Sequence, residues 1–343
     1  MSRFPVLCAP CSRRSTCVRG FSLLELTLAT ALGVMVVTSA VGIFISNRHT
    51  HDATASLSRI QENARMAFDV LVGDIRAAGG NPCGRNLVLT SVVNGAGDRW
   101  WASLGQPVRG FDDDEPFPDA GFGSVPGQRI AGTDGIQITS ATAVAMRVIE
   151  HNTSAATFML SGNRDIEQGD IAMVCDVSQA TVFQVTAAAP GSGALIGYDA
   201  VTGNPGNCSQ GLGFPTRCTA TGTVYRYRDN AALSRLDARR WFIGYNARSG
   251  RSLFQTVLRS NGGAAALVDE EIIEGVTDMQ IRYLFADGND YVAASEVPAS
   301  RWHQVRALRI DLTIADVQAT PATQASTRSR SLAQTIALRN AMP

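Results

Sequence analysis

An uncharged apolar segment near the start of the chain, Leu26–Ile45, constrains the fold more than any other feature. If helical, a segment of this length rises about 30 Å, which is the thickness of the hydrocarbon core of a bilayer. The sequence contains no second stretch of this kind. We therefore expect the chain to cross a membrane once, through an α-helix over about residues 26–45.

The residues before this segment predict its orientation. Residues 1–20 contain four Arg and no acidic residue. By the positive-inside rule, the amino terminus stays in the cytoplasm and the rest of the chain is translocated. A secretory signal peptide also begins basic and continues apolar, but its apolar run ends at a small-residue cleavage site. Here the run continues into a helical pattern, so a plain single-pass anchor is the simpler alternative.

One ionisable residue argues against a plain anchor. Glu25 lies at the edge of the apolar run, where burying a charge is costly unless it finds a partner. Cleavage between Gly20 and Phe21 would create a positive amine on Phe21, about one helical turn from Glu25. That amine could neutralise Glu25 in the same chain or in a neighbouring subunit.

Residues 20–26 read Gly-Phe-Ser-Leu-Leu-Glu-Leu and resemble the prepilin peptidase site of type IV pilins and type II secretion pseudopilins. The resemblance implies that residues 1–20 are a leader cleaved after Gly20 and that Phe21 is N-methylated. It implies that Glu25 engages the amino terminus of another subunit. The implied partners are the prepilin peptidase, the inner membrane, the major pilin and other minor pilins.

Beyond the membrane segment the helix should continue as an amphipathic half over residues 46–78. Apolar residues recur there at steps of three and four, and charged residues avoid the stripe that they form. Gly79, Gly80 and Pro82 then end the helix. We expect one helix over residues 21–78. The predicted stripe consists of Leu57, Ile60, Ala64, Phe68, Leu71 and Ile75.

The remaining residues, 79–343, read as a β-rich domain on the translocated side. Residues 98–133 are rich in Gly, Pro and Asp and predict a long loop. Period-two alternation of apolar and polar residues then predicts half-buried antiparallel strands. A long helix followed by a run of strands gives an α+β class. The predicted strands are Gly135–Ser140, Ile171–Asp176, Thr181–Thr186, Thr223–Arg228, Ser252–Leu258, Met279–Phe285, Leu308–Ile314 and Thr335–Arg339.

Further motifs are similar to PilW-type minor pilins. They include Gln61–Arg65, Asp74–Gly79, Ile273–Tyr283 and the terminal Leu338–Asn340. The resemblance implies a minor pilin that acts in initiating type IV pilus assembly or at the pilus tip. It further implies a pilus or cell-surface location, a contribution to adhesion and twitching motility, and a tip adhesin as a candidate partner.

Four of the seven Cys lie on the translocated side, where an oxidising compartment allows two disulfides. We expect Cys208 to pair with Cys218, because the Gly- and Pro-containing segment between them has little core of its own. Cys83 and Cys175 are then the second possible pair. Three pairings of four Cys exist, and the sequence alone does not choose among them.

The composition and motifs argue against several functions. Thirty basic residues balance thirty acidic ones, which argues against a nucleic-acid binder. We find no metal cage, no cofactor motif and no catalytic motif, so we expect neither an enzyme nor a cofactor. The run Asp112–Glu115 lacks the ligand spacing of a calcium site and favours a solvated loop. Trp100 and Trp101 favour a local core plug over an exposed binding patch.

Two alternatives to a minor pilin stay open at this point. A type II secretion pseudopilin would share the helix and the peptidase. A membrane-tethered periplasmic enzyme or carbohydrate-binding module would keep its uncut amino terminus.

Overall fold

The computed structural model describes residues 22–84, 87–102, 105–141, 145–162, 165–189, 191, 193–316 and 329–340. The expected processing residues Gly20 and Phe21 lie outside these ranges. The chain divides into two compact units, residues 1–55 and 56–343.

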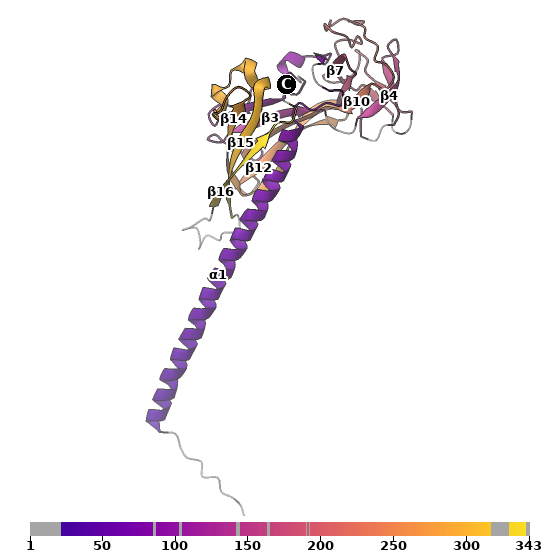
Figure 1. Ribbon diagram of the computed structural model, residues 1–343. Helices are drawn as coiled ribbons and strands as arrows, with labels where there is room; N and C mark the ends of the chain where they lie inside the picture. Colours follow the sequence, from indigo (N-terminus) through magenta and orange to yellow (C-terminus); the bar gives the residue numbers. More distant parts are fainter. Residues whose placement is uncertain are drawn as a thin grey trace, which may run out of the picture. The chain divides into compact units, whose positions relative to one another are not determined.

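Helix α1 runs over Leu23–Ala77 and is the long helix in Figure 1, within one or two residues of the predicted ends. Its part in the first unit exposes its apolar side chains. By length and composition α1 is the one helix in the described part of the chain that could cross a membrane. Gly79 follows with φ 70°, the left-handed conformation that commonly ends a helix.

From Ser56 onward one face of α1 is buried against the β-rich region. The buried residues repeat at helical spacing because a single face of the helix meets the core. The prediction was wrong at Leu57, which is 42 % exposed, because the buried face passes through its neighbour Ser56. The buried residues of α1 are Ser56, Ile60, Ala64, Ala67, Phe68, Leu71 and Ile75.

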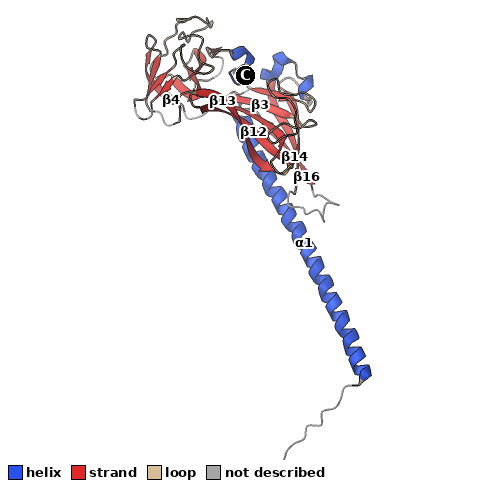
Figure 2. Cartoon of the chain, turned by 180° about the vertical axis from the view of Figure 1, so that it is seen from behind, coloured by secondary structure: helices blue, strands red, loops and turns tan. Residues whose placement is uncertain are grey.

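The described residues of the β-rich region form three sheets (Figures 1 and 2). The eight-stranded sheet has the order β1-β7-β6-β10-β4-β5-β9-β8, the five-stranded sheet β13-β12-β11-β3-β2, and the three-stranded sheet β14-β15-β16. The strands are β1 Val88–Ser91, β2 Val108–Phe111, β3 Gly135–Ser140, β4 Met146–Asn152, β5 Thr157–Leu160, β6 Ile171–Cys175, β7 Gln179–Gln184, β8 Ala187–Ala188, β9 Leu195–Gly197, β10 Ala232–Arg235, β11 Asp237–Tyr245, β12 Arg251–Asn261, β13 Ala264–Glu274, β14 Val276–Phe285, β15 Val305–Ala315 and β16 Ser329–Ala337.

Most strand pairs are antiparallel, as the alternating patterns predicted, and the helix followed by sheets agrees with an α+β class. One pair departs from that pattern: β1 lies parallel to β7, with Val88 opposite Gln179. The strand predicted over Thr223–Arg228 is wrong, because that segment is irregular. The loop predicted over residues 98–133 contains β2 Val108–Phe111, the 3₁₀ turn η2 Trp100–Ala102 and the last residue of the 3₁₀ turn η1 Ala96–Asp98.

The largest hydrophobic core lies between the second half of α1 and the five- and three-stranded sheets. Helix residues such as Leu71 pack there with Trp241 of β11 and Leu308 of β15. The eight-stranded sheet has a core of its own around Phe158, and a further core around Met173 also includes Ala238 of β11. The sheets that cover the helix are therefore distinct from the sheet that forms the rest of the β-rich region.

Candidate functional sites

Glu25 lies in the first turn of α1 and caps the helix. Its Oε2 accepts a hydrogen bond from the backbone N–H of Ser22 at 3.1 Å, and Ser22 Oγ accepts one from Leu24 N–H at 3.3 Å. Ser22 and Glu25 thus form most of a capping box, the Ser-x-x-Glu arrangement that satisfies free amide groups at a helix start. The Ser-x-x-Glu spacing is visible in the sequence, but the interpretation of Glu25 from sequence considered only its charge.

The polar residues of the membrane segment bond to their own helix. The hydroxyl groups of Thr27, Thr30, Thr38 and Ser39 each donate to a carbonyl three or four residues earlier. A hydroxyl satisfied in this way adds little cost to burial in lipid, where water is absent. The apolar side chains from Leu26 to Ile45 are meanwhile exposed. This segment is therefore suited to a lipid environment.

A largely buried carboxylate joins the second half of α1 to the five-stranded sheet. Asp74 Oδ2 accepts hydrogen bonds from Trp241 Nε1 at 2.9 Å, from Gln255 Nε2 at 3.0 Å and from Arg239 Nη1 at 3.2 Å. Arg239 also pairs with Asp237 at 2.8 Å. Burial raises the pKa of Asp74, and the positive charge of Arg239 opposes this effect. Sequence reasoning singled out none of these side chains as helix anchors.

Three further contacts hold the same half of the helix. Arg59 pairs with Asp316 at 2.9 Å, just after β15. Asn63 Nδ2 donates to the carbonyl of Glu274 at 3.2 Å. Asn340 Nδ2 donates to the carbonyl of Ala78 at 3.1 Å, which satisfies a free group at the end of the helix. The docked half of α1 is therefore held along its length.

The opposite face of the docked half is exposed and partly apolar. Met66 is 52 % exposed, Val70 is also exposed, and a Cβ added at Gly73 would meet nothing within 4 Å. Residues 66, 70 and 73 are spaced by four and three, so they share one side of the helix. Arg65 and Asp69 flank them as a weak exposed pair, 3.8 Å apart. This stripe is available to another molecule.

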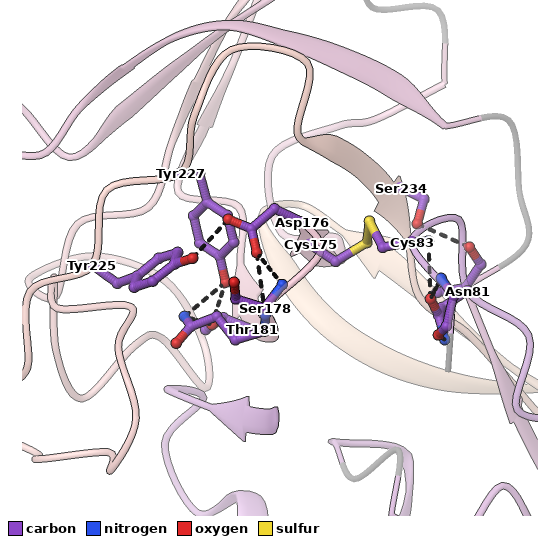
Figure 3. Close-up of a disulfide and its surroundings, with 12 residues drawn as sticks. Asn81, Cys83, Cys175, Asp176, Ser178, Thr181, Tyr225, Tyr227 and Ser234 are labelled. Atoms are coloured by element: carbon purple, nitrogen blue, oxygen red, sulfur yellow. Dashed lines mark hydrogen bonds between the residues drawn. A yellow bond between two sulfur atoms is a disulfide. The ribbon is translucent and has the colours of Figure 1, made fainter. Parts of the chain in front are cut away.

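The described residues contain two disulfides. They are Cys208–Cys218, the pair that we expected from the sequence, and Cys83–Cys175, the second possible pair. Figure 3 shows Cys83–Cys175, which ties the segment after α1 to the end of β6. Asn81 Oδ1 accepts from Cys83 N–H at 3.0 Å and positions that segment. Cys208–Cys218 closes a loop of sequence separation 10.

A buried histidine lies in the core of the eight-stranded sheet. His151 Nδ1 accepts from the backbone N–H of Tyr227 at 2.9 Å, so neutral His151 carries its proton on Nε2 and donates it to Tyr198 Oη at 2.6 Å. The ring stacks on Phe158. Desolvation lowers the pKa of His151 to about 4, and the positive charge of Arg226 adds to the effect.

The acidic run Asp112–Glu115 and the two adjacent tryptophans were both singled out in the sequence, and the structure shows the surroundings of each. Asp112 accepts from the backbone N–H groups of Ala294 and Ser295, each at 2.8 Å, so this member of the run has a structural role. Trp101 is buried, in agreement with a core plug. Trp100 is only half-buried and lines a cleft.

Comparison with known proteins gives one match. A family model described as Type IV Pilus-assembly protein W (PilW) matches residues 240–341, less than half of the chain. These residues run from within β11 to β16 and include much of the region that covers α1. Searches of curated proteins and of solved structures found no match. The family match supports the interpretation that the sequence motifs predicted, a PilW-type type IV pilus protein.

Proposed function

We propose that this chain is a minor pilin that is inserted in the inner membrane, cleaved between Gly20 and Phe21, methylated on Phe21 and built into a type IV pilus. The observation that carries the proposal is α1 itself. One continuous helix joins a lipid-suited segment to a half that docks on the region matching the PilW family model.

The capping geometry of Glu25 supports a role in assembly. Its carboxylate accepts from Ser22 N–H, and the amine created by cleavage would be on the adjacent residue, Phe21. In a filament, the incoming amine of Phe21 from one subunit pairs with Glu25 of another. An ion pair in an apolar setting is strong, because solvent does not screen it.

The exposed stripe of Met66, Val70 and Gly73 supplies a second contact between subunits. It lies opposite the face of α1 that docks on the sheets, and its small residue permits close approach of another helix. A partner helix of another pilin is the occupant that this proposal assigns to it.

A place at the tip or in the initiating complex suits the size of the β-rich region. The eight-stranded sheet, β1 and β4–β10, lies outside the residues that match the family model. A large extra module is easier to accommodate at one end of a filament than at every repeat along it. Other minor pilins and the major pilin are then the direct partners.

The test is incorporation of a Glu25→Ala variant into sheared filaments. We expect Glu25→Ala to reach the membrane at the wild-type level but to be depleted from filaments at least tenfold, because the pairing with the Phe21 amine is lost. Glu62→Ala removes an exposed acidic residue of the same helix and serves as the matched control. Wild-type recovery of Glu25→Ala in filaments would contradict the proposal.

Deletion of the gene that encodes this chain distinguishes a minor pilin from a type II secretion pseudopilin. We expect fewer surface pili and unchanged secretion of type II substrates. Normal piliation with lost secretion would assign the chain to the type II secretion system instead.

A further inference from the structure

We propose that the β-rich region carries a binding site for a neutral saccharide, in a cleft beside Trp100. The proposal goes beyond the role in pilus assembly and does not depend on it. The cleft has a volume of about 750 Å³, which is within the range of about 300–1,000 Å³ typical of sites for small ligands.

Two sheets and one pair of 3₁₀ turns form the cleft. Gln137 and Thr139 are two residues apart on β3, so both side chains lie on the same face, and Arg109 of β2 is directly opposite Gln137. Ser91 of β1, in the eight-stranded sheet, lines another part of the cleft. The turns η1 and η2 contribute Trp100 and its neighbours. Such convergence of polar side chains from separate elements is typical of a ligand site.

Buried contacts hold the cleft residues in place. Arg240 is 3 % exposed, and its Nη2 donates to Asp119 Oδ1 at 2.5 Å. We assign the Gln137 amide with its oxygen toward Arg240, 2.7 Å from Nη2, because the opposite orientation would place its NH₂ group against the guanidinium. The guanidinium of Arg240 lies 4.9 Å from the centroid of the Trp100 ring. This one buried cation therefore fixes an indole, a carboxylate and an amide that all line the cleft.

Two buried polar atoms of the cleft residues lack a hydrogen-bond partner. Within the described part of the chain, nothing lies within bonding distance of Trp100 Nε1 or of Thr139 Oγ1. Thr139 is 2 % exposed, and its backbone N–H and carbonyl already bond to Pro107 and Gly79. Leaving a buried polar atom unsatisfied costs free energy, so a ligand group that reached either atom from the cleft would recover it.

The chemistry of the lining selects the class of ligand. Its charged residues are Asp98, Asp119, Arg99 and Arg109, two of each sign, so the cleft does not favour a strongly charged ligand. The unsatisfied indole N–H needs an acceptor, and the threonine hydroxyl can use either a donor or an acceptor. A sugar hydroxyl is both. The half-buried indole adds an apolar surface for the ring of the sugar.

An extended peptide is the competing occupant. β1 and β2 are edge strands of their sheets within the described residues, and edge strands can pair with a peptide. However, the atoms left unsatisfied in the cleft belong to side chains rather than to a backbone edge. The observations therefore favour the saccharide.

The test uses the full-length chain purified in lauryldimethylamine oxide, because detergents with sugar headgroups would compete for the cleft. The neutral probes are cellotriose, maltotriose, lactose and N,N′-diacetylchitobiose, and the charged probes are sialyllactose and a heparin oligosaccharide. A glycan array extends both sets, and titration calorimetry measures affinity. We expect a neutral glycan to bind and the charged probes to bind more weakly.

Two conservative variants locate the site. Trp100→Phe removes the indole N–H and keeps an aromatic ring, and Thr139→Val removes the hydroxyl at nearly constant shape. Each should weaken binding about tenfold, the effect of losing one good hydrogen bond. Thr139→Val should also keep the wild-type melting temperature, because its hydroxyl has no hydrogen-bond partner among the described residues.

Thr256→Val is the matched control, because Thr256 is a similarly buried threonine of the same sheet that does not line the cleft. Its hydroxyl donates to Asp269 at 2.6 Å, so this variant should melt earlier and bind normally. The proposal is overturned if no neutral glycan binds at millimolar concentration. It is also overturned if Trp100→Phe and Thr139→Val bind like the wild type, if charged glycans bind more tightly, or if the cleft instead captures extended peptides.

Discussion

Trp241 Nε1 donates a hydrogen bond to Asp74 Oδ2 at 2.9 Å, and this bond joins the docked half of α1 to the centre of β11. Asp74 lies on the helix and Trp241 on the first strand of the region that matches the PilW family model. Both residues are largely withdrawn from water, and Trp241 belongs to the main core. The helix and the sheet are therefore held together by a polar bond within an apolar interface.

We predict that Asp74→Ala strongly destabilises the β-rich region. It leaves the N–H of Trp241 and the amide of Gln255 buried without their acceptor, which should lower the free energy of unfolding by about 2–4 kcal/mol. Thermal unfolding followed by tryptophan fluorescence measures the change. Asp69→Ala, which breaks only the exposed pair with Arg65, should stay within about 0.5 kcal/mol of the wild type. Equal effects of the two variants would argue against the anchor.

We predict that losing Cys83–Cys175 destabilises the protein more than losing Cys208–Cys218. Their sequence separations of 92 and 10 correspond to about 4.6 and about 2.7 kcal/mol of unfolded-chain entropy. The paired variants Cys83→Ala with Cys175→Ala, and Cys208→Ala with Cys218→Ala, should melt in that order, the first at the lower temperature. Non-reducing peptide mapping of the wild type checks the pairing, and any other connectivity would refute it.

We predict that His151 makes stability fall as the pH falls between about 6.5 and about 4. The pKa of His151 is about 4 in the folded chain and ordinarily about 6.5, so in this window the unfolded chain binds a proton that the folded chain does not. The contribution of His151 to the free energy of unfolding is complete above about pH 6.5. It falls by about 3 kcal/mol as the pH is lowered to about 4.

A His151→Asn variant isolates this effect. Asparagine keeps an acceptor for Tyr227 N–H but does not titrate, so the difference in unfolding free energy between wild type and variant should shrink as the pH is lowered. Comparing the two proteins also cancels the contribution of Asp134 to the free energy of unfolding, which is present in both and has the opposite pH dependence. Desolvation raises the pKa of Asp134 to about 7, so its contribution is lost as the pH rises toward 7. A difference that does not vary with pH would contradict the prediction.

The long helix could be predicted from sequence because its signals are local. The uncharged segment, the stripe at steps of three and four, and the glycines after Ala77 each act within a few residues. Strands such as β14 and β15 were found for the same reason, since alternation in their own residues reveals them. The parallel pair β1–β7 could not be predicted, because periodicity identifies a strand but not a partner some ninety residues away.

Other features depend on tertiary contacts that leave no local pattern. Val224, Tyr225 and Tyr227 suggest a strand, yet Tyr225 Oη donates to Asp176 and Tyr227 N–H donates to His151, so this segment bonds to side chains instead of a neighbouring strand. β13 was missed because Ala264–Glu274 is a half-exposed edge strand without clear alternation. The cleft at Trp100 was also hidden, because its lining comes from segments far apart in the sequence.

The mature amino terminus tests the central claim most directly. The full-length protein would be purified from a host that makes type IV pili, and its amino-terminal peptide analysed by mass spectrometry. The proposal predicts a chain that begins at Phe21 and carries a methyl group on its α-amine. A mature protein in such a host that still carries residues 1–20 would contradict it.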